Sequence, residues 1–171
     1  MIEKALLIGR TSKDANEIVQ IVLKDPDALE ELMTYFLSND SRMCQTASWS
    51  VGILASKASH LLIPYMPSLI EAHENPIHDS VLRNSIRAWQ FMDIPEEYEG
   101  EVFDLCFNYI VDPGFPIAIR VFSMTVCFNI CKSYPELLKE LKVKLELINQ
   151  SESPGIRSRC KKILKAIDKI L

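Results

Sequence analysis

The amino-acid sequence predicts an all-α protein, an α-α superhelix in which a right-handed solenoid of about four helix pairs follows an N-terminal helical cap. Three observations favour this fold class. Apolar residues recur with helical spacing along most of the 171-residue chain. Only five glycines are present, which favours long helices over tight hairpins. Alternating apolar and polar runs bounded by turns are absent, so we expect no β-sheet.

The first amphipathic segments divide the chain into a cap and a run of repeats. Residues 1–25 are expected to form the cap, with Ile18, Ile21 and Val22 on one face of a helix. The repeats are expected to occupy residues 26–171 of a single domain that spans residues 1–171. Their helices are predicted at residues 25–37, 42–56, 61–74, 79–92, 98–111, 116–133, 135–149 and 155–170.

Prolines mark the starts of several of these helices, because the first helical turn tolerates a residue without an N–H group. They stand between the predicted helices or at their heads, at Pro26, Pro76, Pro95, Pro113, Pro116, Pro135 and Pro154. Pro64 and Pro67 differ, because they fall inside the helix predicted at 61–74. We expect that helix either to start near Pro67 or to kink.

A helix-pair unit recurs about every forty residues. Each unit has an apolar helix, a short turn with acid, Pro or Gly, and an arginine that opens a second apolar helix. The units lie in the stretches "YFLSNDSRMCQTASWSVGIL", "LIEAHENPIHDSVLRNSIRAW", "NYIVDPGFPIAIRVFSMTVC" and "LELINQSESPGIRSRCKKIL". The successive arginines are 41, 37 and 37 residues apart, at Arg42, Arg83, Arg120 and Arg157. This period is typical of α-solenoids.

The repeated units resemble the HEAT-repeat family of HEAT and armadillo-like α-solenoids, over about residues 26–171. The second helix of that family typically opens with a Val-Arg step after an Asp or Pro turn. The matching steps here are Ser41–Arg42, Leu82–Arg83, Ile119–Arg120 and Ile156–Arg157, with Asp40, Asp79 and Asp112 in three of the turns. The resemblance implies a scaffold and specifies no catalytic residues.

The repeat arginines are expected to be structural. In the family pattern the arginine and the turn aspartate link neighbouring repeats, which would pair Arg42 with Asp40, Arg83 with Asp79 and Arg120 with Asp112. Arg120 stands near the head of a helix that is apolar on most sides. We therefore expect it to be largely desolvated and to need an acidic or carbonyl partner.

The resemblance also implies a binding surface, because the second helices of HEAT solenoids line a concave groove. In the helix predicted at 79–92, one face carries Arg83, Asn84, Arg87 and Gln90, and the other carries Leu82, Ile86 and Trp89. One repeat earlier, Trp49 shares a side with Gln45. The candidate groove therefore consists of Gln45, Trp49, Arg83, Arg87 and Gln90. In the alternative reading, Trp49 is a core residue and the arginines form a solvated face.

Charge is unevenly distributed along the chain, although its net value is only −4. Residues 88–119 carry seven acidic and no basic side chains, whereas residues 157–171 have a net charge of +5. In one interpretation, both segments are solvated faces, and the basic one is a polar terminal helix. In the other, the acidic segment is a patch for a basic partner, or the basic end touches nucleic acid.

The leading hypothesis is a non-enzymatic scaffold that binds a protein or peptide segment in the groove. The alternative is a DNA-directed HEAT-like enzyme or binder similar to alkylated-DNA glycosylases, for which Trp49, Arg83 and Arg87 would supply part of a basic stripe. A pigment-loading HEAT-like lyase is a third possibility. The net charge and the acidic segment argue against nucleic acid as the partner.

Neither a metal nor a cofactor is expected from the residue pattern. His73 and His78 are five residues apart across an expected surface turn, which does not match the usual zinc spacing. Cys127 and Cys131 share a helix face but have no second pair to complete a site. The odd number of cysteines, five, suggests reduced core thiols. With no signal-peptide pattern and no run long enough to span a membrane, we expect a cytoplasmic protein.

Overall fold

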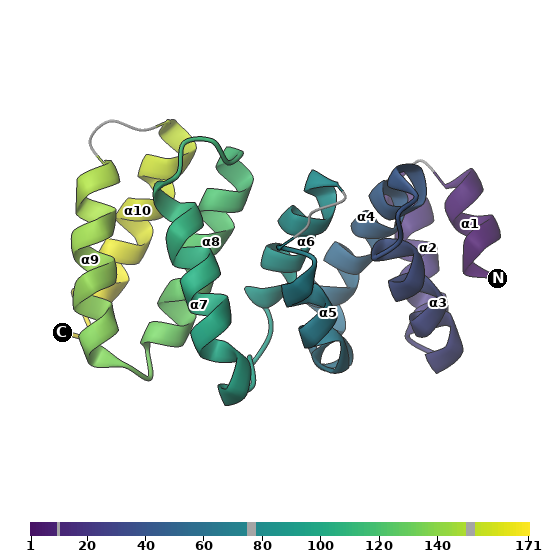
Figure 1. Cartoon of the computed structure of the whole chain (residues 1–171), viewed down its shortest axis with the longest axis horizontal. Helices are drawn as coiled ribbons and strands as arrows, with labels where there is room; N and C mark the ends of the chain where they lie inside the picture. Colours follow the sequence, from purple (N-terminus) through teal and green to yellow (C-terminus); the bar gives the residue numbers. More distant parts are fainter. Residues whose placement is uncertain (10, 75–77, 150–152) are drawn as a thin grey trace. The chain divides into compact units, whose positions relative to one another are not determined.

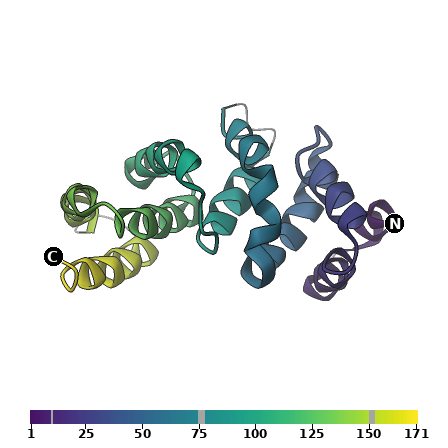
Figure 2. The same ribbon diagram turned by 90° about the horizontal axis from the view of Figure 1, so that it is seen from below.

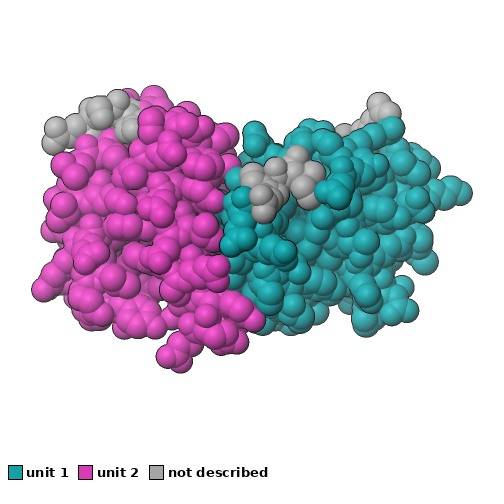
Figure 3. Space-filling model, in the orientation of Figure 1, with its two compact units in different colours: residues 1–93 teal, residues 94–171 magenta. Residues whose placement is uncertain are grey.

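The computed structural model describes residues 1–9, 11–74, 78–149 and 153–171, and these residues contain helices and no strand. The chain divides into two compact units, residues 1–93 and residues 94–171 (Figure 3). The all-α solenoid predicted from the periodicity is confirmed. Each unit is described by itself below.

The first unit contains three successive helix pairs (Figure 1). Its helices are α1 (Ile2–Ile8), α2 (Ser12–Val22), α3 (Pro26–Phe36), α4 (Ser41–Ala58), the 3₁₀ helix η1 (Ser59–Tyr65), α5 (Met66–Glu71) and α6 (Asp79–Trp89). The helices α1 and α2 lie within residues 1–25, the segment expected to form an N-terminal cap. The segments η1 and α5 together take the place of a first helix before α6.

The second unit contains two further pairs. Its helices are α7 (Glu96–Val111), α8 (Ile117–Cys131), α9 (Pro135–Asn149) and α10 (Pro154–Ile167). Helix α8 contacts α7, α9 and α10, so it lies at the centre of this unit. In Figures 1 and 2, α7 and α9 lie on one side of the unit, and α8 and α10 form the other layer.

Side-chain caps set several helix starts. Thr11 and Asp14 form a capping box at the start of α2, in which the Asp14 N–H donates to Thr11 Oγ1 at 3.2 Å. Asp40 accepts the main-chain N–H groups of Arg42 and Met43, each at 3.0 Å, and so caps α4. Pro26 and Pro154 occupy the first turns of α3 and α10, where the missing N–H group has no cost.

The region of Pro64 and Pro67 follows one of the two predicted alternatives. Pro64 lies within the 3₁₀ helix η1, and Pro67 lies in the first turn of α5, which begins at Met66. A proline inside an α-helix would remove a hydrogen bond and clash with the preceding turn. The chain forms a 3₁₀ segment over Pro64, and the α-helix starts next to Pro67 instead of kinking.

Each unit has its own apolar core. In the first unit the largest buried side chains include Phe36, Leu54 and Trp89, which have no measurable exposure. In the second unit Ile110 and Val126 are equally buried. Helix α4 contacts α2, α3 and α6, so the second helices α2, α4 and α6 form a continuous layer in the first unit. This layer positions the candidate surface.

Candidate interaction surface

Small residues let α4 and α6 approach each other closely. The buried face of α4 includes Cys44, Ala47, Ser48 and Gly52. The Ser48 hydroxyl donates to the carbonyl of Cys44 at 2.7 Å and lies 3.0 Å from the hydroxyl oxygen of Ser80 on α6. Because these side chains are short, the two helix backbones can approach, and polar side chains of α6 reach over α4.

Gly52 leaves space on α4 that side chains of α6 enter. A Cβ atom there would lie 2.8 Å from Oδ1 of Asn84 and 3.2 Å from Nη1 of Arg87. Two side chains of α6 therefore occupy the space that a side chain at residue 52 would take. Arg87 thus lies against α4 one helical turn beyond Trp49.

The five residues predicted for the groove all lie on α4 and α6 or directly after α6. We call them the α4–α6 surface: Gln45, Trp49, Arg83, Arg87 and Gln90. Gln45, Trp49 and Arg83 are exposed, and Arg87 and Gln90 are half-buried. The Gln90 side chain donates to the carbonyl of Arg87 at 3.4 Å, which holds these two residues together.

Trp49 is not a core residue, because 45% of it is exposed. The core reading of this tryptophan is therefore wrong, whereas Trp89 is fully buried, as predicted. An exposed indole with Gln45 one turn before it is the type of side chain that anchors a bound polypeptide.

Asn84 does not belong to the open polar stripe, contrary to the prediction. It is 4% exposed, and its amide group donates to the carbonyl of Ser80 at 2.8 Å. The helical wheel placed it correctly beside Arg83 and Arg87. The close approach at Gly52 covers it, and that approach depends on the neighbouring helix.

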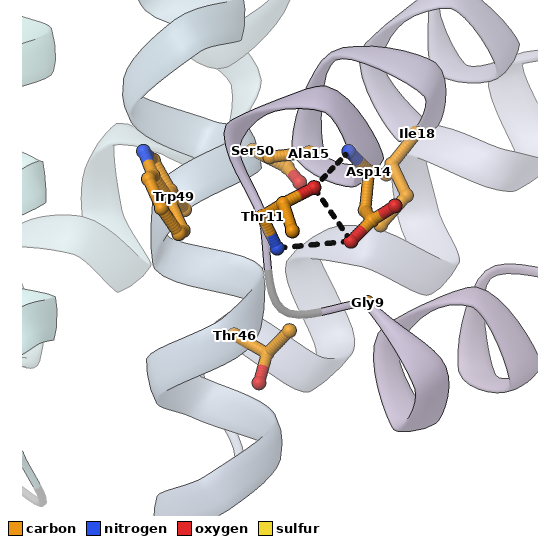
Figure 4. Close-up of a pocket in the computed structure, with 8 residues that line it drawn as sticks. All are labelled: Gly9, Thr11, Asp14, Ala15, Ile18, Thr46, Trp49 and Ser50. Carbon is orange, nitrogen blue, oxygen red and sulfur yellow. Dashed lines mark hydrogen bonds between the residues drawn. The ribbon is translucent and has the colours of Figure 1, made fainter.

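A small hollow lies beside Trp49 (Figure 4). It is lined by residues of α4, of α2 and of the connection before α2, and its volume is about 10 Å³. That volume holds no more than about one water molecule. Thr11 and Asp14 at its edge bond to each other, with the Thr11 N–H donating to Asp14 Oδ2 at 2.9 Å. The hollow is therefore too small for a substrate, and Trp49 offers a surface for contact.

The four repeat arginines lie in different environments. Arg120 is 3% exposed and donates from Nε to the carbonyl of Ile110 at 3.0 Å, which confirms the predicted burial and carbonyl partner. Arg42 and Arg83 are exposed, and Arg157 is half-buried. Arg42 donates to the carbonyl of Leu7 at 3.4 Å.

The aspartate pairing expected for Arg42 and Arg83 is absent from the described residues. Asp40 accepts the main-chain N–H of Arg42 and does not form an ion pair with its guanidinium. Asp79 and Arg83 likewise form no ion pair in the described part of the chain. The turn aspartate at residue 40 serves instead as a helix cap, because the free N–H groups of a helix start are nearer to it than the guanidinium of an exposed side chain.

The two histidines flanking the turn before α6 have separate structural roles. His78 accepts the main-chain N–H of Ser80 at 3.1 Å and caps α6. His73 is buried and stacks on Trp89 with 5.0 Å between ring centroids, so the expected surface position is wrong for His73. Burial lowers the pKa of His73 to about 4, which keeps its ring neutral at pH 7.

The cysteines are buried thiols. Burial raises the pKa of Cys106 and of Cys131 to about 12, and it raises that of Cys127 well above its usual value. A thiol is nucleophilic only as the thiolate, so these three are unreactive near neutral pH. Within the described residues, no three His, Cys, Asp or Glu side chains gather as a possible metal site.

One surface of the second unit was not predicted as a site. Phe103 and Phe107, one turn apart on α7, lie in an open hollow together with Glu96 and Glu99. These four residues follow one another at i, i+3, i+7 and i+11, so they lie along one face of α7. This spacing is the signal in the sequence that could have located the hollow. The acidic charge was noted from the sequence, but the stripe was not.

The stacked helix pairs, with the exposed surface on their second helices, define an α-solenoid. A family model described as HEAT repeat domain matches residues 2–167. The chain belongs to the HEAT-repeat family, whose members are commonly protein-interaction scaffolds, and the match includes the N-terminal pair of α1 and α2. No curated protein matches the chain. In the described residues, no helix is long and apolar enough to cross a membrane.

Proposed function

We propose that the chain is a non-enzymatic scaffold that binds a polypeptide in a concave groove formed by the α4–α6 surface. The observation that carries this proposal is the exposure of Trp49, at 45%, on a helix that packs directly against the helix of Arg83 and Arg87. Tryptophan and arginine are the side chains that most often dominate protein interfaces.

Four of the five residues of the surface have a stated role in this proposal. The indole of Trp49 is the apolar anchor, and it loses its remaining contact with water when the partner binds. Arg83, which is exposed, recognises a carboxylate or main-chain carbonyl at the rim. Arg87 and Gln90 are already held by packing and a hydrogen bond, so little conformational entropy is lost when they contact a ligand.

The charge distribution supports a polypeptide as the ligand in preference to DNA. DNA-binding surfaces use several Lys and Arg contacts to phosphates, and the α4–α6 surface has only two arginines. The net charge of −4 gives no overall attraction for a polyanion. A cytoplasmic setting is part of the same proposal, and the five buried cysteines, none of which forms a disulfide, support it.

The proposal is tested by co-purification from cell extract with wild-type protein and with the triple variant Trp49→Ala, Arg83→Ala, Arg87→Ala. The variant is first compared with wild type by circular dichroism and thermal unfolding, because Arg87 packs against Gly52. We expect a specific protein partner to be retained by wild type and lost from the variant.

Two further measurements complete this experiment. Ile117→Ala is the matched control, because Ile117 is an apolar residue exposed to 49% on α8 in the second unit. This control should keep the partner. DNA binding is measured at low and moderate salt with the same proteins. Identical partners for wild type and the triple variant, or tight and salt-sensitive DNA binding by wild type alone, would refute the proposal.

A further inference from the structure

An open groove lies on the second unit between α7 and α9. Its lining includes Phe103 and Phe107 of α7 and Leu137 of α9, with Tyr134 from the α8–α9 turn, and its volume is about 460 Å³. A second hollow of about 380 Å³ continues from Phe107 along α9. We call the two together the α7–α9 groove. Figures 1 and 2 show α7 and α9 on the same side of the unit, with α8 and α10 in the other layer.

The floor of the α7–α9 groove is apolar and aromatic. Phe103 and Phe107 stack with 5.1 Å between ring centroids. In the second hollow, Val143 is 59% exposed and Leu147 is 73% exposed. Two exposed aliphatic side chains beside an aromatic pair form a continuous surface that gains free energy when it is covered.

The rim of the groove is acidic. Glu96, Glu99, Asp104 and Glu140 line the first hollow, and no Lys or Arg lines it. Glu99 accepts a hydrogen bond from the Tyr134 hydroxyl at 2.7 Å, which fixes one carboxylate at the edge. The other carboxylates of this rim would interact favourably with the positive charges of a cationic ligand.

Gly100 supplies an independent indication that the groove receives another chain. It lies inside the 16-residue helix α7 and lines the groove, where glycine costs about 1 kcal/mol relative to alanine. A Cβ atom at Gly100 would meet nothing within 4 Å. Packing among the described residues therefore does not require this glycine, and the open space beside it would allow an external backbone to approach closely.

A positively charged side chain of the protein already lies over the Phe107 ring, at the boundary between the two hollows. The Lys144 ammonium lies 3.3 Å from the ring centroid and donates to the Phe107 carbonyl at 3.0 Å. Desolvation lowers the pKa of Lys144, as expected of a side chain lying on an aromatic floor. The floor thus accepts an ammonium group, and among the described residues no carboxylate forms an ion pair with it.

We propose that the α7–α9 groove binds a basic amphipathic helix of a partner protein. The apolar side of that helix covers Phe103 and Phe107, its Lys and Arg side chains reach the four rim carboxylates, and its backbone passes close to Gly100. The groove follows α7 from Glu96 to Val111, a distance of roughly 22 Å at 1.5 Å per residue, so it accommodates about four helical turns. All its residues belong to the second unit, so this site is separate from the α4–α6 surface.

The test uses a panel of synthetic peptides of about 16 residues, matched to this groove length, with Leu or Phe at positions i, i+4 and i+7 and Lys or Arg elsewhere. Each peptide has a twin in which Glu replaces every basic residue. Binding is measured by titration calorimetry, and amide chemical shifts locate the peptide on the protein. We expect basic peptides to bind at least about tenfold more tightly than their twins, and more weakly as salt rises.

Two variants distinguish the groove from the rest of α7. Gly100→Phe places a side chain in the open groove and should weaken binding by roughly tenfold or more, because it occupies the space of a central contact. Asn108→Phe adds the same side chain at an exposed position of α7 that does not line the groove, and it should leave the affinity unchanged. Glu140→Gln should weaken the binding of basic peptides and should not weaken that of the acidic twins, because it removes a negative charge from the rim.

Several outcomes would overturn the proposal. One is that no basic peptide binds with a dissociation constant below the order of 1 mM. Others are equal affinity for the acidic twins, and equal affinity of wild type and Gly100→Phe for the basic peptides. Sedimentation that shows dimers of wild type but not of Gly100→Phe would identify a second copy of this chain as the occupant. None of these outcomes depends on Trp49, so they are distinct from a failure of the proposed α4–α6 function.

Discussion

The guanidinium of Arg120 donates a hydrogen bond from Nε to the main-chain carbonyl of Ile110, 3.0 Å away and in the core of the second unit. Ile110 lies in the last turn of α7, where helix carbonyls have no intrahelical partner. Arg120, in the first turn of α8, therefore supplies a hydrogen-bond donor to a buried carbonyl at the end of α7. Its positive charge is also favourable there, because the C-terminal end of a helix dipole is negative.

Replacement of Arg120 by alanine should lower the free energy of unfolding by ~2–4 kcal/mol, because it leaves the buried Ile110 carbonyl without this donor and opens a cavity. Urea denaturation monitored by circular dichroism measures the change. Arg42→Ala is the control, because Arg42 is exposed and, within the described residues, its guanidinium makes one long hydrogen bond of 3.4 Å. It should cost no more than about 0.5 kcal/mol. Equal stability of Arg120→Ala and wild type would show that Arg120 is solvated.

Stability should fall on acidification because of His73. The pKa of His73 is lowered from 6.5 to about 4 by burial, so between these values the unfolded chain binds a proton that the folded chain does not. The contribution of His73 is therefore fully present above pH 6.5 and decreases as the pH falls toward 4. The loss reaches up to roughly 3 kcal/mol at pH 4.

Comparison with His73→Phe separates this contribution from that of the carboxylates. Phenylalanine retains an aromatic ring beside Trp89 and has no proton to bind. Unfolding free energies are measured for both proteins from pH 7 to pH 4. The wild type should lose more stability than the variant over this range. Parallel pH profiles would mean that His73 is accessible to protons in the folded state.

Alanine substitutions at two helical glycines should have opposite effects. Gly52→Ala places a Cβ atom 2.8 Å from Oδ1 of the buried Asn84, so a hydrogen-bonded side chain must move, and we expect a loss of about 1–2 kcal/mol. Gly100→Ala meets open space and should gain about 1 kcal/mol through helix propensity. Thermal unfolding of the two variants checks both signs. Stabilisation by Gly52→Ala would contradict the close approach of α4 and α6.

The repeat period and the helix starts could be predicted from the sequence because both depend on local physical chemistry. Pro26, Pro135 and Pro154 stand at helix starts as predicted. The desolvation of Arg120 was also predictable, because its helix is apolar on most sides, so the charge had to enter the core with a partner.

The misplaced side chains depend on contacts between helices, which a single helical wheel does not contain. Asn84 is polar and lies beside Arg83, but the approach of α4 at Gly52 buries it. His73 looked like a turn residue, but its ring stacks on Trp89 of the next helix. The α7–α9 groove was missed for the same reason. The stripe that ends in Phe103 and Phe107 belongs to α7 alone, and the groove forms only where Leu137 of α9 lies opposite that stripe.

The central claim, that Trp49 anchors a bound polypeptide, is tested most directly by the affinity of a co-purifying partner for single variants. Titration calorimetry compares wild type, Trp49→Ala and the control Ile117→Ala. We predict that Trp49→Ala weakens binding about 30-fold or more, equivalent to about 2 kcal/mol, because an interface anchor is lost, and that Ile117→Ala binds like wild type. The account would be contradicted if the dissociation constant of Trp49→Ala were within about twofold of the wild-type value, because the loss of a hot spot has a much larger effect.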